Sequence, residues 1–577
     1  MKNSIKNYQV ATGLDREVDE QLSEYPEFVR KLLARRGVDT KEKAYAFLNP
    51  NYDEQVHDPF LIKDMDKAVM RILLAIKNEE KIIIYSDYDH DGIPGGVILH
   101  DFFKKIGYKH FSNYIPHRHL EGYGLHIKAI EEFAKSGATL LITVDCGISD
   151  YDQVERANEL GIDMIITDHH LTPEILPKAF AILNSKQPGD TYPYDMLCGS
   201  GVAFKLVQGL VARGDFNLVV GWEKWLLDLV ALGTVADMVP LQGENRALAH
   251  YGLQVMRKSP RIGLTKLLRK MKMRQDSITE DDIGFMLAPR INAASRMGEP
   301  ALAFDMLSTS DEVVADRVTG ALEKLNDERK GVVASMVKEI KHILEKREVS
   351  SKLPAIIVMG NPLWRPGLLG LTANTVMESF GRPVFLWGRG GGEDLKGSCR
   401  SDGDIDIVAL MASVDREVII EYGGHKMAGG FSVSHEKIHL LESSLIEKYE
   451  LHRSSNQDKK EIILDDKLLL EQVNWNTYGL IERLAPFGMD NPKPTFLFEG
   501  IRVSAMKRFG KVANHLELSF QNENGKKIVA IGFFMNEESF GIFPIEVGSK
   551  INLVATLEKS TFRNFPELRL RIIDVVI

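Results

Sequence analysis

Three carboxylates stand at alternate positions in the segment SDYDHDG, residues 86–92. Asp87, Asp89 and Asp91 place three like charges within five residues, which is costly unless a cation lies among them. Carboxylate oxygens followed by a turn glycine suit hard divalent ions such as Mg²⁺ or Mn²⁺. The alternative is a solvated acidic turn that caps the next helix, with Pro94 in its first turn. A calcium loop is excluded, because no glutamate stands at the twelfth position.

The three carboxylates directly follow a continuous apolar run, Ile82 to Tyr85, which predicts a short strand buried on both faces. Two further strands are predicted at residues 139–144 and 164–167. Helical patterns separate the three strands, and this alternation predicts βαβ units and a parallel sheet. Ligand sites in such sheets lie at the carboxyl ends of the strands, so the position of the carboxylates also favours a binding site.

Acidic and imidazole side chains also follow the second and third predicted strands. Asp145 comes after the second strand, and Asp168, His169 and His170 come after the third. Taken separately, Asp145 could cap the next helix, and the histidine pair could satisfy backbone groups. Taken together, the residues are delivered to one edge of one sheet, where imidazole is a common metal ligand and carboxylates balance the metal charge.

Polar residues downstream could extend this site. A single acidic residue, Asp237, follows an apolar helix predicted from Trp222 to Leu232 and is the candidate to complete the cluster. Farther along, Arg290, Asn292 and Arg296 stand in a region of small residues. These three side chains are either surface polar groups or contacts to phosphate.

The glycine-rich segment YGGHKMAGG, residues 422–430, is a second candidate for contact with a ligand. Two glycine pairs flank His425, and Gly424 belongs to the first of them. Glycines allow the backbone to approach a ligand closely, as a phosphate-binding loop requires. By itself such a loop is a weak signal.

Composition sets the broad class of the protein. The chain has 577 residues with 44% hydrophobic residues, which predicts a globular protein of three or four domains. No apolar run approaches the roughly 20 residues that span a bilayer, and the N-terminus has no signal-peptide pattern. Three separated cysteines form no C-x-x-C pair, which indicates a reducing cytoplasm. A net charge of −9 argues weakly against a general nucleic-acid coat but allows a local basic groove.

Changes in the charge and hydrophobic pattern along the chain predict an α/β protein that is divided into several domains. The highly charged stretch after Asp311 reads as a solvated helical connector. Five β-segments near the C-terminus suit a small barrel such as an OB-fold, a frequent binder of single-stranded nucleic acid, although a generic β-barrel is the alternative. The predicted segments are a helical extension packed on the first domain (1–60), a parallel-sheet domain (61–310), the connector (311–352), a smaller α/β domain (353–452) and the barrel (459–577).

These blocks, in this order, closely resemble the RecJ family of single-strand-specific exonucleases, within the DHH phosphoesterase superfamily. The resemblance covers about residues 25 to 577. The matching segments are SDYDHDG (86–92), EGYGLH (121–126), TVDCGIS (143–149), TDHHL (167–171), QPGDTYP (187–193), GSGVAFKL (199–206), LDLVALGTVADMVPL (227–241), APRINAASRMG (288–298), YGGHKMAGG (422–430) and GMDNPKPTF (488–496).

The resemblance implies a DHH phosphoesterase domain at 61–310, a DHH-associated substrate-binding domain at 353–452 and an OB nucleic-acid-binding domain at 459–577. It implies roles for thirteen residues. Two divalent cations, Mn²⁺ or Mg²⁺, would be held by Asp89, Asp91, Asp145, His169 and Asp237, with Asp145 bridging. Asp87 would not bind the metals directly but would orient the ligands or the water. His170 would position or protonate the phosphate. Nucleic-acid contacts would come from Arg290, Asn292, Arg296, Arg400, Gly424 and His425.

The ligand set itself indicates a two-metal phosphodiesterase. The resemblance adds degradation of single-stranded DNA from 5′ to 3′, in DNA repair and recombination. It also implies single-strand-binding protein and a helicase as partners. The chain is further expected to be a cytoplasmic monomer without membrane contact. The alternatives are a nanoRNase or cyclic-dinucleotide phosphodiesterase, which needs no long track for its substrate, and a non-catalytic DHH replication scaffold, which would have lost ligands.

The chain departs from the family pattern at three places. Ile93-Pro94-Gly95-Gly96 replaces a small hydroxyl residue after D-x-D-G, Arg365 replaces a histidine in W-H-x-G, and Cys399 replaces glycine in S-G-R-S. None of these departures removes a predicted metal ligand. They bear on substrate contact and rate.

Overall fold

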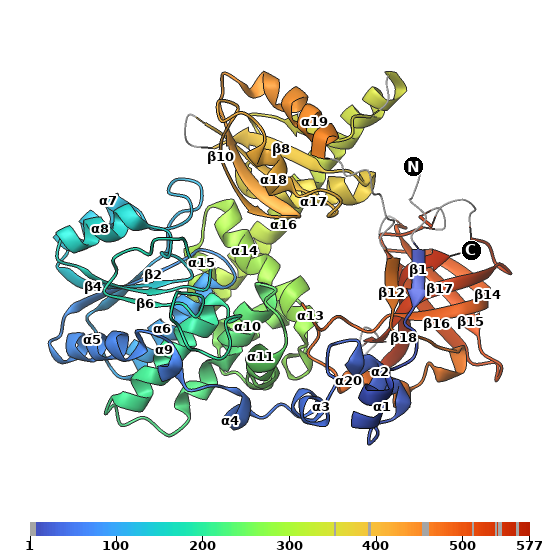
Figure 1. The fold of residues 1–577 in the computed structure, drawn as a ribbon, viewed down its shortest axis with the longest axis horizontal. Helices are drawn as coiled ribbons and strands as arrows, with labels where there is room; N and C mark the ends of the chain where they lie inside the picture. The colour runs from blue at the N-terminus through green and yellow to red at the C-terminus, as the bar shows by residue number, and fades with distance from the viewer. Residues whose placement is uncertain are drawn as a thin grey trace. The chain divides into compact units, whose positions relative to one another are not determined.

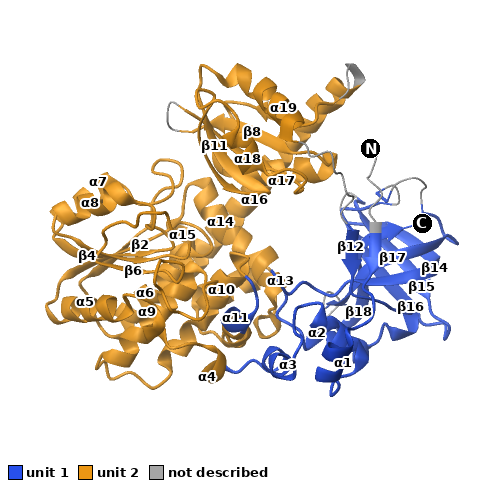
Figure 2. Ribbon diagram, viewed as in Figure 1, with its two compact units in different colours: residues 1–51, 240–246, 457–577 blue, residues 52–239, 247–456 orange. Residues whose placement is uncertain are grey.

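The computed structural model describes residues 7–350, 353–390, 394–452, 461–510, 513–536, 539–540, 545–560 and 565–576. The chain forms two compact units (Figure 2). Unit 1 comprises residues 1–51, 240–246 and 457–577, and unit 2 comprises residues 52–239 and 247–456. In the described residues, no helix combines the length and the apolar character needed to cross a membrane.

Unit 2 begins with a five-stranded parallel sheet in the order β3-β2-β4-β5-β6. The three predicted strands are confirmed, whereas β3 and β6, with four and three residues, were too short to be recognised in the sequence. The strands are β2 (Lys81–Ser86), β3 (Phe111–Tyr114), β4 (Ala138–Val144), β5 (Asp163–Thr167) and β6 (Ala181–Leu183). The predicted α/β class with a parallel sheet is therefore confirmed.

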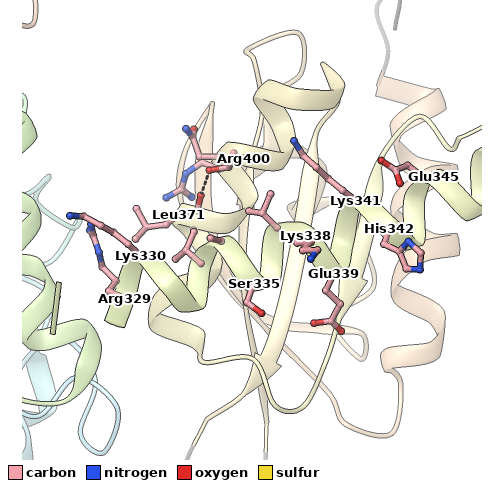
Figure 3. A pocket seen from close by; sticks show the side chains of 16 residues that line it. Arg329, Lys330, Ser335, Lys338, Glu339, Lys341, His342, Glu345, Leu371 and Arg400 are labelled. Atoms are coloured by element: carbon pink, nitrogen blue, oxygen red, sulfur yellow. Dashed lines mark hydrogen bonds between the residues drawn. The ribbon is translucent and has the colours of Figure 1, made fainter. Parts of the chain in front are cut away.

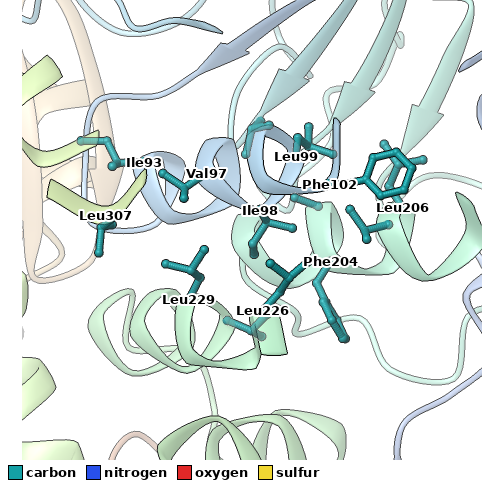
Figure 4. Packing of buried hydrophobic residues seen from close by; sticks show 14 of the residues in the cluster. Ile93, Val97, Ile98, Leu99, Phe102, Phe204, Leu206, Leu226, Leu229 and Leu307 are labelled. Atoms are coloured by element: carbon teal, nitrogen blue, oxygen red, sulfur yellow. The ribbon is translucent and has the colours of Figure 1, made fainter. Parts of the chain in front are cut away.

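Both faces of this sheet are buried, because alternate side chains of each strand pack into different cores. Ile82 and Ile84 lie in the core with α5, α6, α9 and α10, whereas Ile83 and Tyr85 lie in the core with α7 and α8. Figure 1 shows the sheet between these helices, and Figure 4 shows the packing of α6 against α9 and α10. The helices are α5 (Met65–Lys77), α6 (Gly92–Lys105), α7 (Ile127–Lys135), α8 (Tyr151–Glu159), α9 (Gly199–Arg213) and α10 (Leu227–Ala236).

The rest of unit 2 contains the predicted connector and the second α/β sheet. The connector is the 39-residue helix α16 (Glu312–Ser350), and it is more than a solvated spacer. Val318 and Leu322 belong to the core of the parallel-sheet domain, while Ile340 and Leu344 belong to a core of the second sheet. The second sheet has the order β10-β11-β9-β8-β7, with strands β7 (Ile357–Gly360), β8 (Val384–Arg389), β9 (Leu395–Arg400), β10 (Ile419–His425) and β11 (Ala428–Val433), covered by α17 (Pro366–Phe380).

Unit 1 contains the predicted C-terminal barrel. Strand β14 pairs with both β15 and β17, so five strands close on themselves, as an OB-type barrel requires. The strands are β14 (Phe496–Phe509), β15 (His515–Gln521), β16 (Lys527–Phe533), β17 (Lys550–Ser560) and β18 (Glu567–Val576).

The N-terminal helices pack differently from our prediction. Buried side chains of α2 (Glu27–Ala34) and α3 (Lys41–Leu48) share one core with barrel residues such as Phe496. The fully buried Arg246 joins three segments of this unit, because its guanidinium donates to the carbonyl groups of Phe47, Leu484 and Ala485. The prediction that the extension packs on the first α/β domain is therefore wrong for α2 and α3, whereas Tyr52, Val56 and Phe60 near its end do pack against the core of that domain. Its apolar helix faces gave no information about which core they enter.

Candidate metal centre

The first three carboxylates lie in the turn between β2 and α6, at the carboxyl end of a central strand. The Asp87 backbone N–H donates to the carbonyl oxygen of Val144 at 3.0 Å, which continues the pairing of β2 with β4 past the end of β2. Asp89 Oδ1 accepts from the backbone N–H groups of Asp91 at 2.8 Å and Gly92 at 3.1 Å. These bonds fix the Asp89 carboxylate and leave its Oδ2 available.

Asp91 is fully buried and is held by the first turn of α9. Its carboxylate accepts from the backbone N–H groups of Gly199 at 2.5 Å and Ser200 at 2.8 Å, and from Ser200 Oγ at 2.5 Å. The N-terminus of a helix stabilises such an anion. Gly233 closes the other side, since a Cβ there would lie 2.3 Å from Asp91 Oδ1. The site therefore depends on Gly233, to which we assigned no role in the sequence.

Asp145 and His169 come from the two neighbouring strand ends, as the sequence predicted. Asp145 directly follows β4, and its φ of +63° turns the chain sharply there. His169 Nε2 lies 3.1 Å from Asp145 Oδ1, 3.6 Å from Asp237 Oδ2 and 3.8 Å from Asp91 Oδ2. Asp237 directly follows α10. Three carboxylates far apart in the sequence thus converge around one imidazole.

His170 is placed by Asp168, which the sequence pattern brought to the strand end but to which we assigned no role. Asp168 is fully buried, and its Oδ1 lies 2.7 Å from His170 Nδ1. The same carboxylate accepts from the backbone N–H groups of Ile148 and His169. The His170 side chain is 48% exposed. Asp168 is therefore a positioning residue. It orients the His170 ring through Nδ1, and this contact does not involve Nε2.

Three groups of side chains in the described part of the chain could each hold a metal ion. Within each group the ligand atoms lie within 4.8 Å of one another. Asp145 occurs in two of the groups, which agrees with a bridging position. We predicted that Asp87 would orient the ligands without binding a metal itself, but its carboxylate belongs to one of the groups. The groups are Asp87–Asp89–Asp145, Asp91–His169–Asp237 and Asp145–His169–His170.

Electrostatics support a site that needs cations. Burial and then the charge of Asp89 raise the pKa of Asp87, and burial and then Asp91 and Asp89 raise the pKa of Asp145. Burial, Asp91 and Asp89 likewise raise the pKa of Asp237 to about 8. Among the described residues, Oδ1 of Asp87 and Oδ1 of Asp145 are buried without a hydrogen-bond partner. Buried, mutually repelling carboxylates with unsatisfied oxygens fit divalent cations well.

A cluster of arginines lies near the carboxylates. Burial lowers the pKa of Arg296 to about 9, and the charges of Arg118, Arg329 and Arg400 act in the same direction, whereas Asp89 opposes them. The Arg118 guanidinium lies over the ring of Tyr88, 4.9 Å from its centroid. Several guanidinium groups that repel one another would be stabilised by an anion such as phosphate. We predicted Arg296 and Arg400 but missed Arg118 and Arg329, because neither lies in a pattern that distinguishes it from surface arginines.

Arg290 and Asn292 lie with Arg296 on α14 (Ala288–Met297) but are placed differently. Arg290 forms an ion pair with Glu323 of α16, and it donates to the carbonyl oxygen of Met286 at 2.8 Å. Its donors thus serve the protein interior, and we leave it out of the proposed nucleic-acid contacts. Asn292 Oδ1 is buried and lacks a hydrogen-bond partner among the described residues, so Asn292 stays a candidate.

The glycine-rich segment forms a β-hairpin. Gly423 pairs with Gly430, and Gly424 with Gly429, between the antiparallel strands β10 and β11. Gly424 has φ +136°, and a Cβ there would lie 2.3 Å from the carbonyl oxygen of Ala428. The glycines therefore permit close pairing of two strands. His425 is exposed at the tip of this hairpin, where contact with nucleic acid stays a prediction.

Packing explains the two glycines of one departure from the family pattern. A Cβ on Gly95 would lie 2.5 Å from Val144 Cγ1, and a Cβ on Gly96 would lie 2.8 Å from Ser86 Oγ. The two glycines thus let α6 pack closely on the sheet beneath the metal site. Cys399 is buried beside Met411 and Arg365 is half-exposed 3.9 Å from Glu328, and neither position explains its substitution.

Comparisons with known proteins agree with this arrangement. Family models match as the DHH family, N-terminal domain at residues 81–234, the DHHA1 domain at 353–450 and the RecJ OB domain at 464–574. The single-stranded-DNA-specific exonuclease RecJ of Bacillus subtilis is 34% identical over 97% of this chain and 69% of its own length. RecJ of Escherichia coli is 30% identical over 97% of this chain and 98% of its own. The crystal structure of RecJ with Mn²⁺ from Thermus thermophilus has a TM-score of 0.80 at 25% identity, over 99% of this chain and 79% of that one.

Proposed function

Because the chain belongs to the RecJ family of single-stranded-DNA-specific exonucleases, we propose that it is a metal-dependent phosphodiesterase that degrades single-stranded DNA from the 5′ end. The observation that carries this proposal is the convergence of five carboxylates and two histidines at one edge of the parallel sheet, beside an arginine cluster. A nanoRNase, a cyclic-dinucleotide phosphodiesterase and a non-catalytic scaffold are less well supported, because the ligands and the C-terminal barrel are both present.

The residues fall into three proposed roles. Asp89, Asp91, Asp145, His169 and Asp237, together with Asp87, would hold two divalent ions, Mn²⁺ or Mg²⁺. Such ions supply activation of water and stabilisation of negative charge on the phosphate. His170, whose ring is fixed by Asp168, would donate a proton or a hydrogen bond to a phosphate oxygen. The arginines would bind the backbone phosphates of the strand and orient the scissile bond.

A groove along α16 gives the strand a second surface. It has a volume of about 1300 Å³ and is lined by α16 from Arg329 to Glu345, by α17 near Gly370 and by Arg400. Figure 3 shows Arg329 and Lys330 at one end of the groove and His342 and Glu345 at the other. The lining includes Lys338 and Lys341 as well. Since the groove shares Arg329 and Arg400 with the arginine cluster, a bound strand can continue from one surface to the other.

The groove leads to a prediction about salt dependence. Replacing Lys341 by alanine should weaken binding of a long single strand and reduce the slope of log Kd against log salt concentration by about 1, because one phosphate contact is lost. Cleavage of a trinucleotide should be unchanged, since it does not reach the groove. Lys324→Ala removes the same charge from an exposed position of α16 outside the lining and should change neither quantity. Equal effects of both variants would refute a specific path along the groove.

Direction and substrate choice are tested directly by digestion. Strands labelled at the 5′ or 3′ end, blunt duplex and RNA would be incubated with the full chain and Mn²⁺ or Mg²⁺. We expect mononucleotides to be released from the 5′ end of single-stranded DNA and blunt duplex to persist. Release from the 3′ end would refute the direction, and no cleavage of any single strand would refute the activity.

The proposal also covers where the enzyme acts and with which partners. We expect a monomeric cytoplasmic enzyme of DNA repair and recombination. Single-strand-binding protein and a helicase are its expected partners, because they expose and deliver the single strand that the enzyme requires. The barrel of unit 1 would hold that strand by stacking and charge.

A further inference from the structure

The segment that follows β6 contacts the turn that carries His169 and His170, and two of its side chains have no role in the function proposed above. Asn184 comes directly after β6 and is fully buried. Its Nδ2 donates to the carbonyl oxygen of His170 at 2.9 Å. Lys186 Nζ donates to the carbonyl oxygen of His169 at 2.5 Å. Each histidine is therefore bound through its own carbonyl group by a different side chain.

The backbone of each histidine is held on both sides of its Cα atom. Asp168 Oδ1 accepts from the N–H group of His169 at 2.7 Å and from that of His170 at 3.1 Å. This carboxylate is shared, so its loss would displace both rings. The carbonyl groups have separate partners, so the bond from Lys186 acts on His169 and the bond from Asn184 acts on His170. The direction of each ring can thus be changed alone.

The segment is itself anchored to β6. Gln187 Nε2 donates to the carbonyl oxygen of Ile182 at 2.6 Å, and the Gln187 backbone N–H donates to that of Asn184 at 3.0 Å. Asn184 Oδ1 also accepts from the Lys186 backbone N–H at 2.9 Å. The two bonds of Gln187 do not involve the Asn184 side chain, so truncation of that side chain leaves the segment attached.

We propose that Lys186 and Asn184 are positioning residues with separate tasks, Lys186 for His169 as a metal ligand and Asn184 for His170 at the phosphate. Groups that orient a metal ligand change metal affinity or activity when they are lost. His169 forms one metal-binding group with Asp91 and Asp237, so a displaced His169 weakens that group. The inference rests on the proposed function and deepens it, because it assigns the two histidines separate supports.

Metal affinity provides the first test. Isothermal titration calorimetry would measure Mn²⁺ binding to the full chain and its variants. We expect the Kd to rise about tenfold or more in Lys186→Met and to change less than about threefold in Asn184→Ala. Lys186→Arg keeps a donor and should recover most of the affinity. Thr172→Val removes a bond from Thr172 Oγ1 to the carbonyl oxygen of Lys186, which reaches neither histidine, and should leave the Kd unchanged.

Turnover of single-stranded DNA at saturating Mn²⁺ provides the second test. We expect Asn184→Ala to lose about tenfold or more in kcat, whereas Lys186→Met stays within about threefold of the wild type once the metal is saturating. A folding defect lowers both quantities, so opposite patterns in the two variants cannot come from misfolding. Equal losses in both variants, no loss in either, or either effect in Thr172→Val would overturn the proposal. If the wild type cleaves no single strand, the proposed function fails, while calorimetry still tests Lys186.

Discussion

Asp145→Asn is expected to lower the turnover of single-stranded DNA by at least about 1,000-fold, because the variant loses the carboxylate that belongs to two of the three metal-binding groups. Asparagine is chosen because it nearly preserves the volume of aspartate and tolerates the positive φ at this position better than alanine does. The measurement is the rate of nucleotide release with saturating Mn²⁺.

Stability separates this chemical effect from damage to the fold. Burial and neighbouring carboxylates raise the pKa of Asp145, so its charge is unfavourable in the metal-free chain. The melting temperature in EDTA should therefore stay the same or rise in Asp145→Asn. The increase in melting temperature that Mn²⁺ gives the wild type should shrink, because the variant binds the ions less tightly. Asp490→Asn, at an exposed residue with φ +57°, is the matched control and should keep full turnover. Near-normal turnover of Asp145→Asn would refute the two-metal assignment.

The residues that meet at the edge of the parallel sheet were predictable, because the order of strands and polar residues along the chain determines which of them lie there. Each apolar strand was followed directly by its polar residues, and parallel strands bring their carboxyl ends to one side. Asp87, Asp145 and His169 were therefore placed together by the sequence alone, and their proximity in the structure agrees with the prediction. Asp237 was predicted less directly, since a lone acidic residue after a helix normally reads as a cap, and only the cluster already predicted at the sheet edge made it a candidate ligand.

The arginine cluster was much less predictable. Arg118 and Arg329 come from a loop and from a charged helix, where arginine is common on any surface. Their significance depends on proximity to Arg296 across long sequence distances, which no local pattern contains. At Arg290 the motif suggested phosphate contact, but it contained no sign that Glu323 binds the guanidinium. Periodicity also predicts that a helix buries a face but not which core receives it, as the N-terminal helices show.

Arg296→Met is expected to lower kcat/KM for single-stranded DNA by about 100-fold or more, which is the second large effect. Arg296 lies at the centre of the arginine cluster, and Nη1 donates to the carbonyl oxygen of Gly367 at 2.6 Å, leaving the other donors of the guanidinium for phosphate. A lost bidentate contact to a phosphate that orients the scissile bond affects the transition state as well as binding. Arg296→Lys should recover only part of the loss, because lysine keeps the charge but not the planar pair of donors.

The loss of activity in Arg296→Met could also arise only from the lost hydrogen bond to Gly367, which joins α14 to the N-terminus of α17. Rescue by guanidinium distinguishes the two causes. In Arg296→Ala, added guanidinium ion should restore single-strand cleavage in a saturable way, since it can occupy the vacated cavity and contact phosphate. Arg317→Ala, at an exposed position of α16, should lose little activity and show no rescue. If Arg296→Ala melts at a lower temperature and guanidinium restores nothing, Arg296 serves the fold. Saturable rescue at an unchanged melting temperature requires that the arginine act on the substrate itself.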